Sequence, residues 1–425
     1  MKKQLAVVIT AVLASTTTYA GQALPDLGKT GVVSTGTAFN PAISVILDGS
    51  FYRESGHGDE SYSEALSHVA GFRNPHDHDA HGHGELENGF NLNHAEIVMS
   101  ASVDHYFDAL LNLGVSEHGM EIEEAYGVTR NLPAGLQLKM GKFYSGIGYQ
   151  NSQHAHDWSF ADMALPYQLV FGEHGLNEKG LQLSWTPATR HYSVFGVEAL
   201  QGENAGMANY EGARDYDNGA ASSKNGPRLY TAFGKFAPNL GHDHALQIGL
   251  FGGQSSLHQN LHGSRGEEGK TSFVGTDWVY KYDGGGHLGH RNLTLQAEYI
   301  YRIRDLEVVG VRTGDELNHP IGQQRKDIQD AIYMQGVYGI APRWQTGLRY
   351  ELAGITNKRE TDLATTSWKS SDRITASVTW LPTEFSKLRL QAGQSRLSEG
   401  DEREDFRQVF LQYQLSLGVH GAHRF

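Results

Sequence analysis

The sequence predicts an all-β protein, a transmembrane antiparallel β-barrel of about 16 strands with long extracellular loops and short periplasmic turns. Three observations predict it: a hydrophobic period of two that recurs along the chain, an export signal at the start, and an aromatic last residue, Phe425. The period is clearest from Leu293 to Ile303, where apolar or aromatic residues occupy nearly every odd position. Water-soluble β-sandwiches also alternate, but the three observations together favour the outer-membrane barrel.

Residues 1–20 have the build of a cleavable secretory signal. Lys2 and Lys3 precede a mostly apolar run, residues 5–14, and a small residue ends the segment. A membrane anchor is the competing interpretation, but a spanning helix needs roughly 20 apolar residues and this run is shorter. We therefore expect cleavage before Gly21 and export to the bacterial outer membrane.

The composition restricts the classes of function. The chain has no cysteine, so we expect neither disulfides nor a thiolate metal site, and any metal must be held by His, Asp or Glu. The formal net charge of −13 disfavours nucleic acid as a partner and mildly favours cations. The mean hydropathy of −0.45 is polar, and a closed barrel reconciles such an average with a membrane because only one strand face contacts lipid.

Each strand is predicted from its own alternation of apolar and polar residues. The predicted strands are residues 43–53, 90–101, 104–116, 120–130, 135–143, 179–186, 191–201, 228–237, 244–254, 271–282, 291–303, 328–340, 343–353, 372–381, 385–396 and 405–419. Glu124 departs from the pattern, because its parity faces lipid between Ile122 and Tyr126. This predicts either a β-bulge or a misplaced strand boundary.

The connections between these strands support the same topology. Tight connections rich in turn residues, such as 131–134 and 341–342, alternate with mostly long ones, as barrels with short periplasmic turns require. The long connections are 54–89, 144–178, 202–227, 255–270, 304–327 and 354–371, with shorter ones near 117–119 and 397–404. Residues 43–425 are thus predicted to form one barrel domain, and the periplasmic segment 21–42 before it is too short for a folded plug.

Charges of both signs fall on the predicted inward faces of the strands, which suits a hydrated channel. They are Lys139, Lys281, Arg302, Arg349 and Arg389 against Glu96, Glu121, Glu123, Glu298 and Glu351.

The first long loop, 54–89, is rich in histidine and contains candidate metal ligands. Imidazole and carboxylate bind zinc, nickel or copper, and a short His-rich tract is typical of metal binding. The candidates in this loop are His76, Asp77, His78, Asp79, His81 and His83. The tract has no rigid spacing and contains flexible glycines, so we expect weak exchanging sites rather than one closed tetrahedral centre. The alternative is a hydrophilic loop with incidental histidines.

The long loop 144–178 contains a second group of candidate ligands: His154, His156, Asp157 and His174. Large pores narrow through a long loop that folds inward, and its residues then set selectivity. An aromatic and apolar stretch between Trp158 and Phe171 would give such a loop something to pack. If the loop enters the barrel, its histidines relay a captured cation; the alternative is that they only form hydrogen bonds to the barrel wall.

Several stretches of the chain resemble a known family. They are Asn40 to Gly49, the His-rich loop, Gly141-Lys142-Phe143 running on to His154-Ala155-His156-Asp157-Trp158, and the ending Leu417 to Phe425. The chain resembles the short, His-rich, zinc-regulated outer-membrane β-barrel proteins of Gram-negative bacteria, which are often labelled TonB-dependent receptors. The resemblance implies a part in zinc uptake under scarcity.

The predicted function is that of a porin-like channel rather than an enzyme. Zinc or a similar divalent cation is captured by the His/Asp-rich loops and diffuses to the periplasm as the transported ligand, with no prosthetic group. The expected partners are the divalent metal ion, the lipid bilayer of the outer membrane, and the barrel-assembly machinery through the C-terminal strand ending at Phe425, and self-association stays open. The alternatives are a TonB-dependent type of metal receptor, or a general porin or adhesin with incidental histidines.

Overall fold

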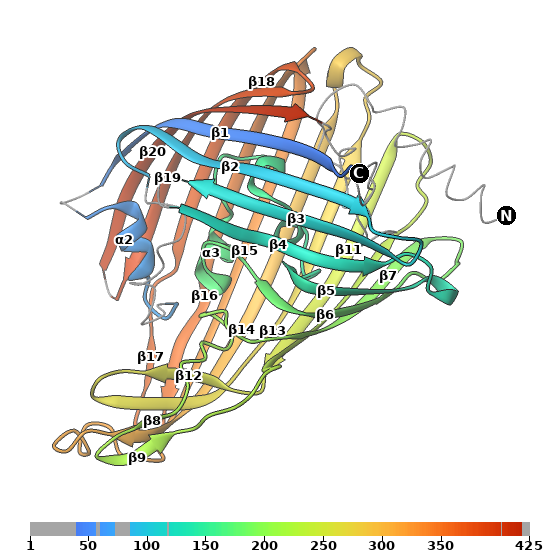
Figure 1. Cartoon of the computed structure of the whole chain (residues 1–425). Coiled ribbons are helices and arrows are strands. Elements are labelled where there is room, and N and C mark those ends of the chain that lie inside the picture. Colours follow the sequence, from blue (N-terminus) through green and yellow to red (C-terminus); the bar gives the residue numbers. More distant parts are fainter. Residues whose placement is uncertain (1–39, 57–59, 73–85, 117–118, 401, 419–425) are drawn as a thin grey trace.

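A computed structural model describes residues 40–56, 60–72, 86–116, 119–400 and 402–418. The predicted signal, most of the segment 21–42, the candidate ligands between His76 and His83, and Phe425 lie outside the described residues. The described chain forms one continuous antiparallel sheet that closes on itself as a barrel (Figure 1). Closure follows because β1 (Ala42–Ser55) pairs with both β2 (Gly89–Ser102) and the last strand, β20 (Glu402–Gly418).

Sixteen strands form the barrel, and each corresponds to a predicted strand, so the predicted fold class is confirmed. The others are β3 (Phe107–Ser116), β4 (Gly119–Thr129), β5 (Leu136–Tyr144), β6 (Asn177–Trp185), β7 (Tyr192–Leu200), β10 (Leu229–Ala237), β11 (His244–Ser255), β13 (Arg265–Tyr282), β14 (Leu293–Val311), β15 (Gln324–Ala341), β16 (Trp344–Thr361), β18 (Ser371–Thr383) and β19 (Ser386–Glu399). Four short strands lie at the end of the barrel with the long loops: β8 (Arg214–Asp215), β9 (Asn218–Ala221), β12 (His258–Leu261) and β17 (Thr365–Ser367).

The period-two alternation places apolar side chains outside the barrel and polar side chains inside it. Along β20, Leu411 and Leu415 are exposed on the outer surface, whereas Gln408 and Gln412 are buried in the lumen. This is the reverse of a water-soluble core, and it is the arrangement that a lipid-embedded barrel with hydrophilic contents requires.

Strands β13 to β16 continue past their predicted outer ends, so the predicted loops 255–270, 304–327 and 354–371 are too long. β13 begins at Arg265, β14 runs to Val311, and β16 runs to Thr361. The extra residues lie beyond the apolar band, where a strand needs no apolar outer face. The sequence signal for a lipid-facing strand therefore fades before the strand ends.

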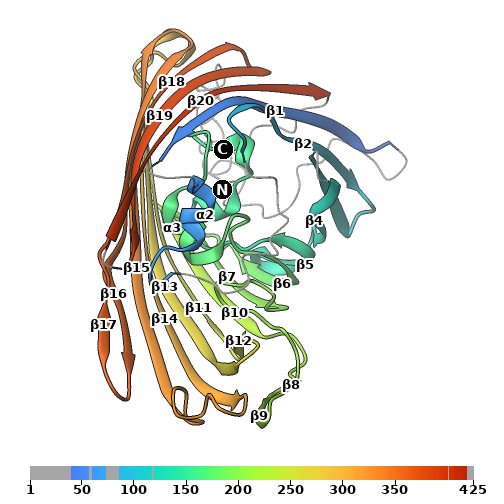
Figure 2. The ribbon, with the colours of Figure 1, turned by 90° about the vertical axis from the view of Figure 1, so that its left-hand side faces the viewer.

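Parts of two loops fold into the barrel (Figure 2). We call residues 56–88 loop L1 and residues 145–176 loop L3. L1 contributes the helix α2 (Tyr62–Ser67) and L3 the helix α3 (Leu165–Phe171), and both helices lie within the ring of strands. No helix among the described residues is long and apolar enough to cross a bilayer.

The aromatic stretch of L3 packs in the lumen, as the sequence analysis anticipated for a loop that enters the barrel. The side chains of Tyr167 and Phe171 are buried in one apolar cluster with Phe143 of the wall, and the buried ring of Phe160 packs under the guanidinium of Arg349. α3 begins where the backbone N–H of Leu165 donates to a carboxylate of the wall, and it ends at a glycine with a positive φ that other residues rarely adopt. L3 therefore narrows the lumen.

Candidate functional site

A β-bulge in β4 turns two consecutive glutamates into the lumen. Asn112 of β3 pairs with Glu124, and the next residue, Leu113, pairs with Ile122, so Glu123 is the extra residue of the bulge. Glu123 and Glu124 are both buried, although a regular strand would send one of them to the lipid. The predicted bulge is thus confirmed, and its effect is to place two neighbouring carboxylates on the inner face.

A second bulge lies in β2, two strands away. The register between β1 and β2 shifts between Asp48 and Gly49, which leaves Asn93 as the extra residue. His94 and Glu96 follow it at a spacing of two, so both side chains face the lumen and are buried. Bulges next to functional sites commonly re-aim side chains, and here they lie beside the same group of residues.

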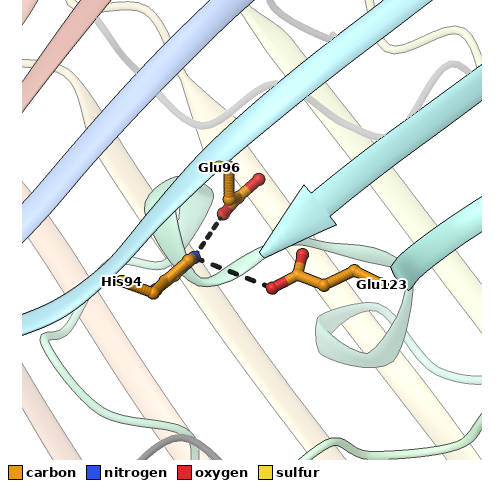
Figure 3. A group of neighbouring side chains, drawn as sticks. All are labelled: His94, Glu96 and Glu123. Atoms are coloured by element: carbon orange, nitrogen blue, oxygen red, sulfur yellow. Dashed lines mark hydrogen bonds and ion pairs between the residues drawn. The ribbon is translucent and has the colours of Figure 1, made fainter. Parts of the chain in front are cut away.

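His94, Glu96 and Glu123 point toward one another across the inner wall (Figure 3). His94 Nε2 lies 2.7 Å from Glu96 Oε1 and 3.9 Å from Glu123 Oε1. One potential ligand atom from each residue lies within 4.8 Å of the other two. An imidazole and two carboxylates from two strands thus form a compact group of metal-ligating chemistry.

Asn112, on the strand between β2 and β4, joins the two carboxylates. Its side-chain N–H group donates to Glu96 Oε2 at 3.0 Å and to Glu123 Oε2 at 3.2 Å. Because the Oε2 atoms are held by this amide, the Oε1 atoms remain turned toward His94. Hydrogen bonds of this kind orient the ligands of metal sites.

L3 brings two of its predicted ligands, His154 and His156, against this group. His156 Nδ1 lies 2.8 Å from Glu96 Oε1. His154 Nδ1 lies 3.2 Å from Glu123 Oε2, and its Nε2 lies 2.8 Å from Glu124 Oε2. The two imidazole rings stack with centroids 5.7 Å apart, so three imidazoles and three carboxylates meet where L3 contacts the wall.

The surrounding carboxylates raise the pKa of the two L3 imidazoles. Burial lowers the pKa of His154, but the carboxylates of Glu96, Glu123 and Glu124 outweigh burial and hold this pKa well above its ordinary value. Burial likewise lowers the pKa of His156, and Glu96 and Asp157 raise it above its ordinary value. The carboxylates therefore favour the protonated form of both rings, and a metal that used them as ligands would compete with that proton.

The other two predicted L3 ligands lie at the edge of this cluster. Asp157 Oδ2 is 3.6 Å from His156 Nε2, and the Asp157 side chain is 42% exposed. His174 lines a cavity of about 260 Å³ that is also lined by His94 and Glu123. The cavity lies between α2, L3 and the wall of β1, β2 and β20.

The lining of this cavity is acidic. Five carboxylates line it: Asp48, Glu54, Glu123, Asp162 and Glu173. Among the residues that the structure describes, no lysine or arginine belongs to the lining. A low-dielectric wall with this charge attracts cations and repels anions.

The sequence analysis did not assign His94 to a site. Two features of the sequence could have indicated it: the spacing His94-x-Glu96, which places both side chains on one inward face, and the interruption of the apolar–polar alternation at Glu123 and Glu124. Glu96 and Glu123 were predicted to face the lumen, which is confirmed, but alternation alone does not reveal which inward residues of different strands meet.

No known protein-family profile matches the chain. An uncharacterized protein of Aquifex aeolicus (strain VF5) is 35% identical over 399 residues, which cover 91% of this chain and 80% of the relative.

Solved outer-membrane proteins share the fold. The outer-membrane channel DcaP of Acinetobacter baumannii superposes with a TM-score of 0.52 at 10% identity, covering 89% of this chain and 97% of that one. A loop L8 deletion mutant of OmpT of Vibrio cholerae gives 0.51 at 11% identity, covering 89% and 99% of the two chains. The anion-selective porin of Comamonas acidovorans gives 0.51 at 8% identity with the same coverage. The barrel is therefore porin-like.

Proposed function

The chain belongs to the same family as the uncharacterized Aquifex aeolicus protein, and we propose that it is an outer-membrane channel that admits zinc or a similar divalent cation. The closed barrel, its apolar outer surface and its porin-like fold support a channel rather than an enzyme. The preference for a divalent cation rests on one observation: the acid-lined cavity leads to the group formed by His94, Glu96 and Glu123.

The proposed path follows the acidic side of the lumen. L3 narrows the barrel, so an ion that passes must lose part of its hydration shell near the lining of the constriction. Carboxylates there stabilise a cation electrostatically, and imidazoles provide ligands that suit zinc better than sodium or calcium. Movement to the periplasm then needs no energy beyond the concentration gradient.

We propose that the His-rich part of L1 concentrates the ion outside the channel. Its candidate ligands, from His76 to His83, precede Leu86, which lines the cavity. Weak exchanging sites favour delivery because a tightly bound ion would not leave.

The sign of the lining charge distinguishes this proposal from a porin for anions. The similarity to the Comamonas porin concerns the fold alone, and one fold accommodates either selectivity because lumenal side chains determine it. An energy-coupled metal receptor and a general porin with incidental histidines remain the rival functions. The receptor would need an energised partner protein for uptake. The general porin would show no preference among cations.

Ion selectivity tests the proposal in planar bilayers. In a KCl gradient the purified channel should show a reversal potential of cation-selective sign. Replacing the cavity carboxylates by Asp48→Asn, Glu54→Gln and Glu173→Gln together should move that potential toward zero. A wild-type channel that favours chloride, or one that does not conduct, would contradict the proposal.

A further inference from the structure

We infer that His94, Glu96 and Glu123 form a binding centre for one borderline divalent cation such as zinc, and that His156 joins it from L3. This inference rests on the proposed function, because it names the point in the lumen where the transported ion would bind. It also makes a separate claim, that a metal ion would connect L3 to two strands of the wall.

The spacing of the ligand atoms fits one ion. Zinc bonds of about 2.0–2.2 Å in a tetrahedral site place ligand atoms about 3.3–3.6 Å apart. The separations from His94 Nε2, 2.7 Å to Glu96 Oε1 and 3.9 Å to Glu123 Oε1, lie on either side of that range. Small rotations of the two glutamate side chains therefore bring all three atoms to bonding distance.

His156 lies outside the compact group of three, but it is an L3 residue in contact with it, and a rotation of its side chain would make it a fourth ligand. Its Nδ1 lies 2.8 Å from Glu96 Oε1, the same oxygen that contacts His94. Both imidazoles therefore approach one carboxylate oxygen, and an ion there would have nitrogen ligands from the wall and from L3. A site with three wall ligands and an exchangeable fourth suits an ion that must later leave.

The ligand types select the class of ion. Calcium and magnesium prefer sites made only of oxygen, whereas imidazole nitrogen favours zinc, copper and nickel. With no cysteine in the chain, soft ions such as copper(I) are disfavoured. We therefore expect zinc to bind and calcium not to compete.

The surrounding hydrogen bonds hold the carboxylates ready for an ion. Asn112 holds the Oε2 atoms of Glu96 and Glu123, and His154 bridges Glu123 to Glu124. Both glutamates thus keep the Oε1 atoms directed at His94. The bulge at Glu123 provides this geometry, because a regular strand would not present both Glu123 and Glu124 to the lumen.

Metal titration of the purified full-length protein in detergent tests the centre without requiring transport. The background variant carries four substitutions, His76→Gln, His78→Gln, His81→Gln and His83→Gln. Metal binding to the His-rich segment then does not obscure binding to the lumenal site. Cobalt(II) is the probe, since its visible absorption reports nitrogen and oxygen ligation, and zinc is then titrated against it. We expect one cobalt ion per chain, displaced by zinc and not by calcium.

Glu123→Gln and His94→Gln should each weaken binding at least tenfold. His68→Gln is the matched control, because His68 Nδ1 also contacts a carboxylate, Glu60, at 3.1 Å but lies outside the centre. Heat-modifiable gel mobility checks that each barrel is folded. Unchanged affinity in both folded variants, or equal displacement by calcium, would overturn the centre. Intact binding in a channel that does not pass zinc would instead reject only the proposed function.

Discussion

Asn112 holds two carboxylates at once, and this single amide controls how they face the lumen. The imidazoles of His94 and His154 also contact these buried carboxylates and offset their mutual repulsion. The Asn112 amide Nδ2 donates to one oxygen of each carboxylate, which fixes their rotamers relative to each other. Asn112 is therefore a positioning residue for the inferred centre rather than a ligand.

Asn112→Leu should weaken cobalt or zinc binding by about 10- to 100-fold while the barrel still folds, because it removes the donor and keeps the volume. Asn260→Leu is a matched control, since Asn260 Nδ2 donates to the buried carboxylate of Glu267 at 2.8 Å. Metal titration compares the two variants. Equal loss of affinity in both, or no loss in Asn112→Leu, would argue against a positioning role.

The sequence indicated the candidate ligands of L3 more readily than the candidate ligands of the wall, for a physical reason. His154 and His156 stand together in a short motif, so their shared chemistry is visible along the chain. His94 and Glu123 meet only because β2, β3 and β4 pair in one register. Alternation gives the face of each residue, but the register and its bulges determine which residues become neighbours.

L3 is attached to the wall near its beginning and again within its aromatic stretch. Asp162 forms ion pairs with Arg349 and Arg373, each at 2.7 Å. Earlier in the loop, the backbone N–H groups of Tyr149 and Gln150 donate to the carboxylate of Glu298, both at 2.9 Å. These contacts are charge-assisted and buried, so L3 should move as one unit with the wall rather than as a free loop.

Asp162→Asn should release the middle of L3, because Arg349 and Arg373 then keep only the carboxylate of Glu351, which belongs to the wall, and lose the one that belongs to the loop. Breaking a buried pair costs on the order of 3 kcal/mol, so hydrogen exchange in residues 158–171 should accelerate by about a hundredfold. Asp327→Asn is the matched control: Asp327 also bridges two arginines, Arg325 and Arg359, but makes no contact with L3. Equal exchange in L3 of both variants would contradict the attachment.

The same attachment has a predictable pH dependence. Burial raises the pKa of Asp162, but Arg349 and Arg373 outweigh it and leave the pKa below the ordinary value of 3.8. A depressed carboxylate pKa contributes stability that is present above the ordinary value and is lost as the pH falls through the lower, folded-state value. The Asp162 contribution should therefore be fully present at pH 5, begin to decline near the ordinary value of 3.8, and disappear only below the lower, folded-state pKa. If L3 of the wild type lost its protection from hydrogen exchange at a higher pH than L3 of Asp162→Asn, this assignment would be contradicted.

Strand prediction succeeded wherever lipid contact imposes an apolar face, and it failed where that requirement ends. All barrel strands were identified, and the parity break at Glu124 indicated the bulge in β4. The outer extensions of β13 to β16 were missed because both of their faces meet water or other loops. The docking of L3 was only anticipated from its aromatic residues, since the arginines that hold it lie on strands far away in sequence.

Across the whole barrel, the arginines gather on one side, β14 to β19, where the buried carboxylates of Glu298 and Glu351 also lie. Asp48, Glu96 and Glu123 belong to β1, β2 and β4, whereas Arg302, Arg349, Arg373 and Arg389 belong to β14 through β19. Several of the arginines are occupied by L3: Arg389 donates to the carbonyl of Trp158, and Arg302 to that of Val170. Arginines and carboxylates of this side thus hold the loop together, and in the proposed function the carboxylates of β1, β2 and β4 would face a passing cation.

The apolar outer face of the barrel gives a prediction for the entire molecule. Leu411, on the outer face of β20, is 45% exposed in the isolated chain, and we expect lipid to cover it. Leu411→Arg should destabilise the folded barrel in bilayers by about 2–4 kcal/mol if the residue lies near the midplane. Leu411→Met is the control and should be close to neutral. Urea titration in vesicles measures both, and equal stability of the two variants would argue that this face does not contact lipid.

The decisive measurement is zinc influx into sealed proteoliposomes that contain a zinc-sensitive dye. We expect the wild-type channel to carry zinc inward at a rate well above that of protein-free vesicles, and Glu123→Gln and His94→Gln to slow zinc while potassium conductance is retained. Wild-type vesicles that conduct potassium but take up no more zinc than protein-free vesicles would contradict it.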